Sequence, residues 1–106
     1  MVKFLMIATF LMALTSGVRA DEPGNAASGR RIAETWCSRC HVVDGTSPSG
    51  PRTGAPAFGA IAANKATTPL AIRVFLQSQH DRMPALHVAP VEIDDLTAYI
   101  LSLRKH

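Results

Sequence analysis

The 106-residue chain contains only two cysteines, Cys37 and Cys40, and His41 directly follows the second. A disulfide across so short a segment would constrain little of the unfolded chain. A domain of this size nevertheless has a marginal apolar core, and it commonly needs a disulfide, a metal or a large bound group for stability. The sequence therefore predicts that a bound group completes the core.

The first 20 residues have the pattern of a secretory signal peptide. Lys3 gives a positive start, an apolar run extends from Phe4 to Leu14, and small residues lead to Ala20. The alternative is an uncleaved membrane anchor, but a spanning helix needs roughly 20 apolar residues and this run is shorter. We expect residues 1–20 to be removed, leaving residues 21–106 as one exported domain without stable membrane insertion.

The charge distribution gives no indication of a nucleic-acid partner. Of the 11 Lys and Arg residues, Lys3 and Arg19 lie in the signal peptide, which leaves nine against 8 Asp and Glu. The isolated basic pairs Arg30-Arg31 and Arg104-Lys105 predict solvated helix surface, whereas nucleic-acid binding needs a clustered basic face.

Hydrophobic spacing predicts an all-α fold of three to five short helices, because no stretch alternates at a period of two. Asn25 or Ser28 is expected to cap the first helix, and Thr68 followed by proline the third. The expected helices run from Asn25 or Ala26 to Arg39, from Phe58 to Lys65, from Pro69 to Gln79, and from Pro90 to near the end of the chain.

Two of these helices have an apolar face that the sequence identifies. In the third helix, Leu70, Val74 and Phe75 are expected to face inward. The last helix has the clearest pattern, because apolar residues recur at steps of three and four, beside a tyrosine. These residues are Ile93, Leu96, Ile100 and Leu103, with Tyr99 beside them.

The segment Cys37-Ser38-Arg39-Cys40-His41 carries the chemistry. Residues three and four apart share one face of a helical turn, so both thiols and the imidazole can reach one flat object. This spacing is the attachment signature of c-type haem, in which two thioethers form and the histidine binds iron. A thioredoxin-like redox pair would need a βαβ pattern, and zinc would need a fourth ligand from a second cluster. We therefore predict one haem c, bound covalently through Cys37 and Cys40 and ligated by His41.

The sequence resembles the class I c-type cytochromes, which are small electron carriers with one haem. Gly29, eight residues before Cys37, matches a glycine in the first helix of that family. Leu96-Thr97-Ala98-Tyr99 matches the last-helix pattern, whose Leu and Tyr cross over that glycine. The resemblance implies a cytochrome c fold, with helices wrapped around the haem.

The resemblance also implies a methionine on the iron opposite His41. Among the four methionines, Met83 alone lies outside the signal peptide, 42 residues after His41 and directly before Pro84. His80 and His87 are the alternatives, and either would lower the reduction potential.

A proline carbonyl is expected to accept a hydrogen bond from the ring of His41, as the resemblance implies. Pro51 and Pro56 are the candidates, and Pro56-Ala57-Phe58 is closer to the family pattern. The alternative is that both prolines only shape the loop.

Two protein ligands would leave the iron no open position for a substrate. The expected function is therefore a soluble periplasmic carrier of single electrons, not an enzyme, and no catalytic residue is predicted. One alternative is a haem sensor or enzyme in which Met83 is displaced. Another is a dedicated electron acceptor or subunit of a periplasmic dehydrogenase. The expected partners are redox proteins, bound transiently by a monomer: a membrane cytochrome complex, an oxidase or a dehydrogenase.

Overall fold

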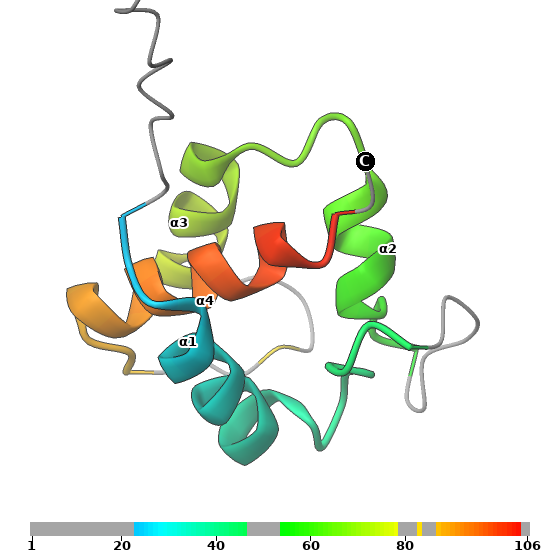
Figure 1. The fold of residues 1–106 in the computed structure, drawn as a ribbon, viewed down its shortest axis with the longest axis horizontal. Helices are drawn as coiled ribbons and strands as arrows, with labels where there is room; N and C mark the ends of the chain where they lie inside the picture. Colours follow the sequence, from blue (N-terminus) through cyan, green and yellow to red (C-terminus); the bar gives the residue numbers. More distant parts are fainter. Residues whose placement is uncertain (1–22, 47–53, 79–82, 84–86, 105–106) are drawn as a thin grey trace, which may run out of the picture.

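The computed structural model describes residues 23–46, 54–78, 83 and 87–104. In these residues every regular element is a helix, as the sequence predicts (Figure 1). None of these helices is both long and apolar enough to cross a membrane. The elements are α1 (Ala26–Ile32), the π-helical turn η1 (Ala33–Cys37), α2 (Phe58–Ala63), α3 (Pro69–Gln77) and α4 (Pro90–Ser102). The predicted signal peptide, Pro51 and His80 lie outside the described residues.

Side-chain caps begin three of the helices. The Asn25 side chain accepts a hydrogen bond from the Ser28 N–H at 2.9 Å, which decides between the two predicted caps of α1. Thr68 accepts from the Ala71 N–H at 3.1 Å, with proline at the first position of α3. The Glu92 carboxylate accepts from the Ala89 N–H at 2.9 Å at the start of α4. Each cap satisfies a backbone donor at or near a helix start.

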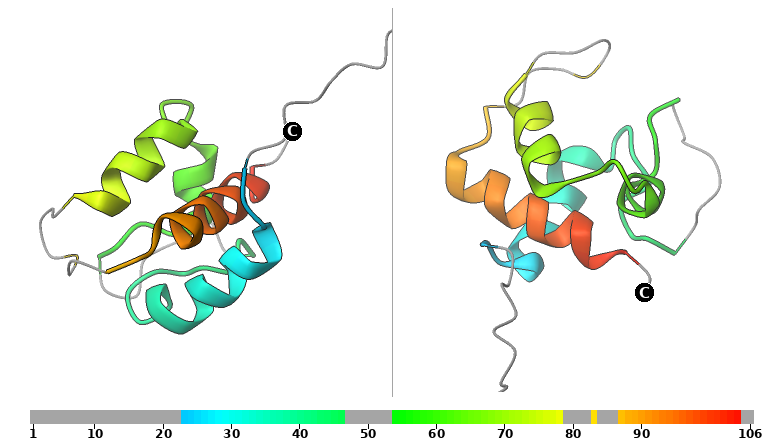
Figure 2. Two further views of the ribbon diagram at one scale, coloured as in Figure 1. Left: turned by 90° about the vertical axis from the view of Figure 1, so that its left-hand side faces the viewer. Right: turned by 90° about the horizontal axis from the view of Figure 1, so that it is seen from above.

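Helix α4 is the centre of the fold, because α1 packs on one side of it and α2 and α3 on the other (Figure 2). Most of its predicted apolar face is buried, with Ile93, Leu96, Tyr99 and Ile100 all at most 6% exposed, while Leu103 is partly buried against the core. The interior therefore forms around α4, the helix whose apolar face the sequence predicts most clearly.

The crossing of α1 and α4 depends on Gly29, as the resemblance implies. A Cβ atom at Gly29 would lie 1.9 Å from the Asp95 carbonyl oxygen and 2.8 Å from the Tyr99 Cβ. Both contacts are far inside van der Waals distance, so only a residue without a side chain allows this approach. The start of α1 is also bonded to α4, because the Asn25 N–H donates to the Asp95 side-chain carboxylate at 2.7 Å.

The predicted inward face of α3 is wrong in part. Leu70 and Val74 are 68% and 52% exposed, whereas Ile72 is buried and Leu76 packs against the core. Residues two apart point about 200° apart around a helix, so a face centred on Ile72 turns Leu70 and Val74 outward. Phe75 is also half-exposed, although its ring lines the pocket described below.

Arg104 is likewise not the solvated surface residue that the sequence predicts. Its Nε donates to the Ala62 carbonyl at 2.9 Å, and its Nη2 donates to the Thr67 carbonyl at 2.8 Å. The partly buried guanidinium thus ties the end of α4 to the end of α2 and to the segment that precedes α3. By contrast, Arg30 and Arg31 are exposed, as predicted.

Replacing Gly29 with alanine should destabilise the protein, because the new methyl group forces the two helices apart. Overpacking of this kind typically costs about 1–3 kcal/mol. Denaturant unfolding of the haem-loaded protein, followed by circular dichroism, measures the change.

Gly59→Ala is the matched control for this prediction. A Cβ at Gly59 would meet its nearest neighbour at 3.8 Å, an ordinary contact, so alanine within α2 should be neutral or slightly stabilising. Equal stability of the wild type and Gly29→Ala would show that the close crossing is unimportant.

Candidate cofactor site

The cysteine segment follows a change in helix geometry. In η1 the Ser38 N–H donates to the Ala33 carbonyl, five residues back, at 3.0 Å. The N–H groups of Cys40 and His41 then both donate to the Cys37 carbonyl, at 3.2 and 2.9 Å. The predicted regular helix to Arg39 is therefore wrong over its last part, but a tight helical turn still presents the motif. Single wide turns of this kind are frequent at functional sites.

The structure places the two cysteines in different surroundings. Cys37 is 5% exposed and lines the apolar pocket described below, whereas Cys40 is exposed and does not line that pocket. Burial raises the pKa of the Cys37 thiol to about 11. A thioredoxin-like nucleophile needs a lowered pKa, so the environment of Cys37 disfavours that alternative.

The imidazole of His41 is held by a backbone carbonyl. Its Nδ1 lies 2.6 Å from the carbonyl oxygen of Pro56, which can only accept a hydrogen bond. Nδ1 must therefore carry the proton, and Nε2 keeps a free lone pair, which is the form in which neutral histidine binds a metal. Of the two prolines that the sequence offered, Pro56 makes this contact.

Two further hydrogen bonds position the chain after His41. The Phe58 N–H donates to the Val42 carbonyl at 2.9 Å, and the buried Tyr99 hydroxyl donates to the Val43 carbonyl at 2.5 Å. The first bond brings the Pro56 segment beside His41. The second bond attaches the loop after His41 to α4. The Phe58 ring also lies beside the imidazole, with 5.2 Å between the ring centroids.

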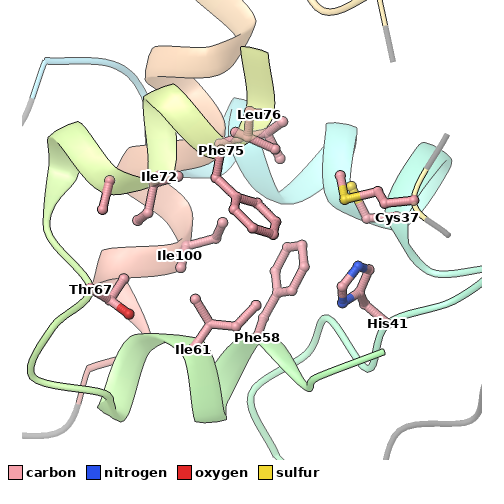
Figure 3. A pocket seen from close by; sticks show the side chains of 12 residues that line it. Cys37, His41, Phe58, Ile61, Thr67, Ile72, Phe75, Leu76 and Ile100 are labelled. Carbon is pink, nitrogen blue, oxygen red and sulfur yellow. The ribbon is translucent and has the colours of Figure 1, made fainter. Parts of the chain in front are cut away.

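These residues surround an open, mainly apolar pocket of about 680 Å³ (Figure 3). Helices α2, α3 and α4 supply most of the wall. The lining residues are Cys37, His41, Phe58, Ile61, Thr67, Ala71, Ile72, Phe75, Leu76, Met83, Leu96 and Ile100.

Met83 is half-buried and lines the same pocket as Cys37 and His41. Of its two predicted rivals, His80 lies outside the described residues, and His87 is exposed and lines a different hollow beside Trp36. The structure thus brings together three of the four predicted site residues, with Cys40 on the adjoining turn. Among the described residues no group of three His, Cys, Asp or Glu side chains could hold a metal ion.

The donors in the pocket fit a haem. A buried thiol, an imidazole with a free Nε2 and a thioether meet in a cavity whose other walls are aliphatic and aromatic. An apolar porphyrin suits such walls, because its burial removes their surface from water. The sequence did not identify Thr67 as a residue of the pocket wall, because the neighbouring Thr68-Pro69 pair indicates only the start of a helix.

Comparison with known proteins identifies the family of the chain. The chain matches the family described as cytochrome c oxidase, cbb3-type, subunit III over residues 24–100. It is also 29% identical over 94 residues to cytochrome c-552 of Bradyrhizobium diazoefficiens, which covers 89% of each protein. No solved structure matches the chain.

The family match includes the cysteine segment, the four helical elements that precede α4, and most of α4. The two matches confirm the expected c-type cytochrome fold and cofactor, and they indicate electron transfer rather than catalysis. The chain belongs to the cbb3-type cytochrome c oxidase subunit III family, and it is a c-type cytochrome that carries haem c bound covalently through Cys37 and Cys40.

Proposed function

We propose that the protein carries single electrons in the periplasm, with its haem iron ligated by His41 and Met83. The observation that supports this most directly is that both side chains line the pocket that receives Cys37. Two protein ligands on one iron leave no position for a substrate, which favours electron transfer over catalysis.

The haem supplies the one-electron chemistry, and the residues of the chain set its conditions. The Pro56 carbonyl keeps the imidazole of His41 in one tautomer and one orientation. A thioether ligand and burial in an apolar pocket both raise the reduction potential, because they disfavour the extra positive charge of ferric iron. Ile61, Ile72 and Ile100 contribute to that apolar wall.

Export and partners complete the proposal. The charged start, apolar run and small residues of the first 20 residues support removal of a signal peptide and a periplasmic location. The family description names an oxidase subunit, so a terminal oxidase is the partner we favour. We propose transient docking of a monomer, since contacts of redox carriers are small.

Met83→Ala should remove the sulfur ligand and open the iron. We expect loss of the long-wavelength sulfur-to-iron absorption band in the ferric protein, a lower reduction potential, and prompt carbon monoxide binding after reduction. Visible spectroscopy and potentiometry measure all three effects.

Leu76→Ala is the control for this substitution, because it also enlarges the pocket but leaves Met83 in place. It should retain the sulfur band. A wild-type protein that lacks the band and binds carbon monoxide promptly at neutral pH would instead support the sensor or enzyme alternative.

Expression of the full chain in a bacterium that matures c-type cytochromes tests export. We expect the periplasmic fraction to contain a protein that begins at Asp21 and carries the added mass of one haem, as measured by intact-mass spectrometry. A variant with both Cys37 and Cys40 changed to serine should be processed at the same position without haem. Recovery of residues 1–20 on a membrane-bound product would contradict this part of the proposal.

A further inference from the structure

We propose that Thr67 and Arg104 form the subsite for the haem propionates. This inference rests on the covalent haem c of the family and is independent of the identity of the sixth ligand. It starts from the two unlike ends of the pocket. Figure 3 shows Cys37 and His41 at one end and Thr67 at the other, with the rings of Phe58 and Phe75 between them.

The chemistry of haem orients it between these ends. A haem has its two vinyl groups along one edge of the porphyrin and its two propionates along the opposite edge. Since the cysteine thioethers form at the vinyl groups, the Cys37 end of the pocket receives that edge. The two carboxylates are therefore directed toward the end that Thr67 occupies.

Thr67 offers a hydrogen-bond donor at this end. Among the described residues that line the pocket, only Thr67, Cys37 and His41 have a side chain with an N–H, O–H or S–H group. The backbone of Thr67 is fixed, because its N–H donates to the Asn64 carbonyl at 3.0 Å and its carbonyl accepts from Arg104. Its hydroxyl bonds to no other described residue, whereas that of Thr68 caps α3. The hydroxyl can therefore turn toward a carboxylate.

Arg104 brings a positive charge next to this end of the pocket, although it does not itself line the pocket. Its Nη2 lies 2.8 Å from the Thr67 carbonyl oxygen. In the described part of the chain, Arg30 pairs with Glu34 and Arg73 with Asp94, but no carboxylate accompanies the partly buried Arg104. A guanidinium has five donors, and the two carbonyl contacts use only two of them. A propionate would supply the missing counter-charge, in the planar pairing that arginine favours.

The direction of α3 adds to the positive electrostatic potential at this end of the pocket. The helix begins at Pro69, two residues after Thr67, so its positive end lies at this side of the pocket. Carboxylates are stabilised near a helix N-terminus. Thus a hydroxyl, a guanidinium that pairs with no carboxylate of the described residues, and the positive end of a helix lie at or beside the end of the pocket where the haem would carry negative charge.

The experiment uses haem-loaded protein with ¹³C-labelled propionates and records both the reduction potential and the redox-difference infrared bands of the carboxylates. Arg104→Gln should lower the potential, because a positive charge near the haem disfavours ferric iron, and it should shift the labelled bands. Arg104→Lys keeps the charge and should lower the potential less. Thr67→Val should shift the bands, and Thr67→Ser should restore them.

Arg30→Gln removes one positive charge from the exposed surface of α1 and should leave the labelled bands unchanged. Thr67→Val keeps both backbone contacts of Arg104, so it tests the subsite even where the arginine variants are unstable. Lower melting temperatures with wild-type bands and potential would overturn the proposal, since Arg104 would then only fasten the backbone. The sulfur-to-iron band should persist in every variant, which separates this test from that of Met83.

Discussion

The close crossing of α1 and α4 at Gly29 is the contact on which the site depends. The first helix leads directly into η1 and Cys37, and α4 supplies Leu96 and Ile100 to the pocket wall. The separation of these two helices therefore sets the position of the attachment turn relative to the wall. Because the Asp95 carbonyl occupies the space of a missing side chain, that separation has little freedom.

Hydrogen bonds to three backbone carbonyls then fix the position of His41 relative to these helices. Val42, Val43 and Pro56 accept hydrogen bonds from a backbone N–H, the Tyr99 hydroxyl and the His41 ring. Val43 is buried, so its carbonyl oxygen needs a partner, and the partner of each of the three carbonyls comes from another segment. Satisfying them fixes both the loop after the motif and the tautomer of the imidazole, so structural and chemical requirements are met by the same bonds.

The charge of Arg104 distinguishes the Thr67 end of the pocket from the Cys37 end. The C-terminal end of α4 brings Arg104 to the segment before α3, and two backbone carbonyls hold it there. No acidic side chain of the described residues pairs with this partly buried cation, and burial of an unpaired charge is costly unless a bound group compensates it. In a small domain with a marginal core, one cofactor can thus supply apolar surface to the helices and negative charge to this arginine.

The sequence alone determined what depends on neighbours within about one helical turn. The Cys37–His41 spacing indicated covalent haem, the caps at Asn25 and Thr68 marked helix starts, and the apolar period of α4 identified its buried face. Such features follow from local geometry, which the order of residues specifies directly. The resemblance to class I cytochromes supplied the role of Gly29.

Only the tertiary structure decided what depends on segments far apart in the chain. The sequence misassigned Leu70 and Val74 because a short helix with apolar residues on several sides has no unique inward face until its neighbours are known. It favoured Pro56 over Pro51 for His41 only through the resemblance to the family, and it did not foresee that Arg104 contacts Thr67, 37 positions away. Contacts of this kind arise when α4 packs between the other helices, and no rule of local spacing encodes that arrangement.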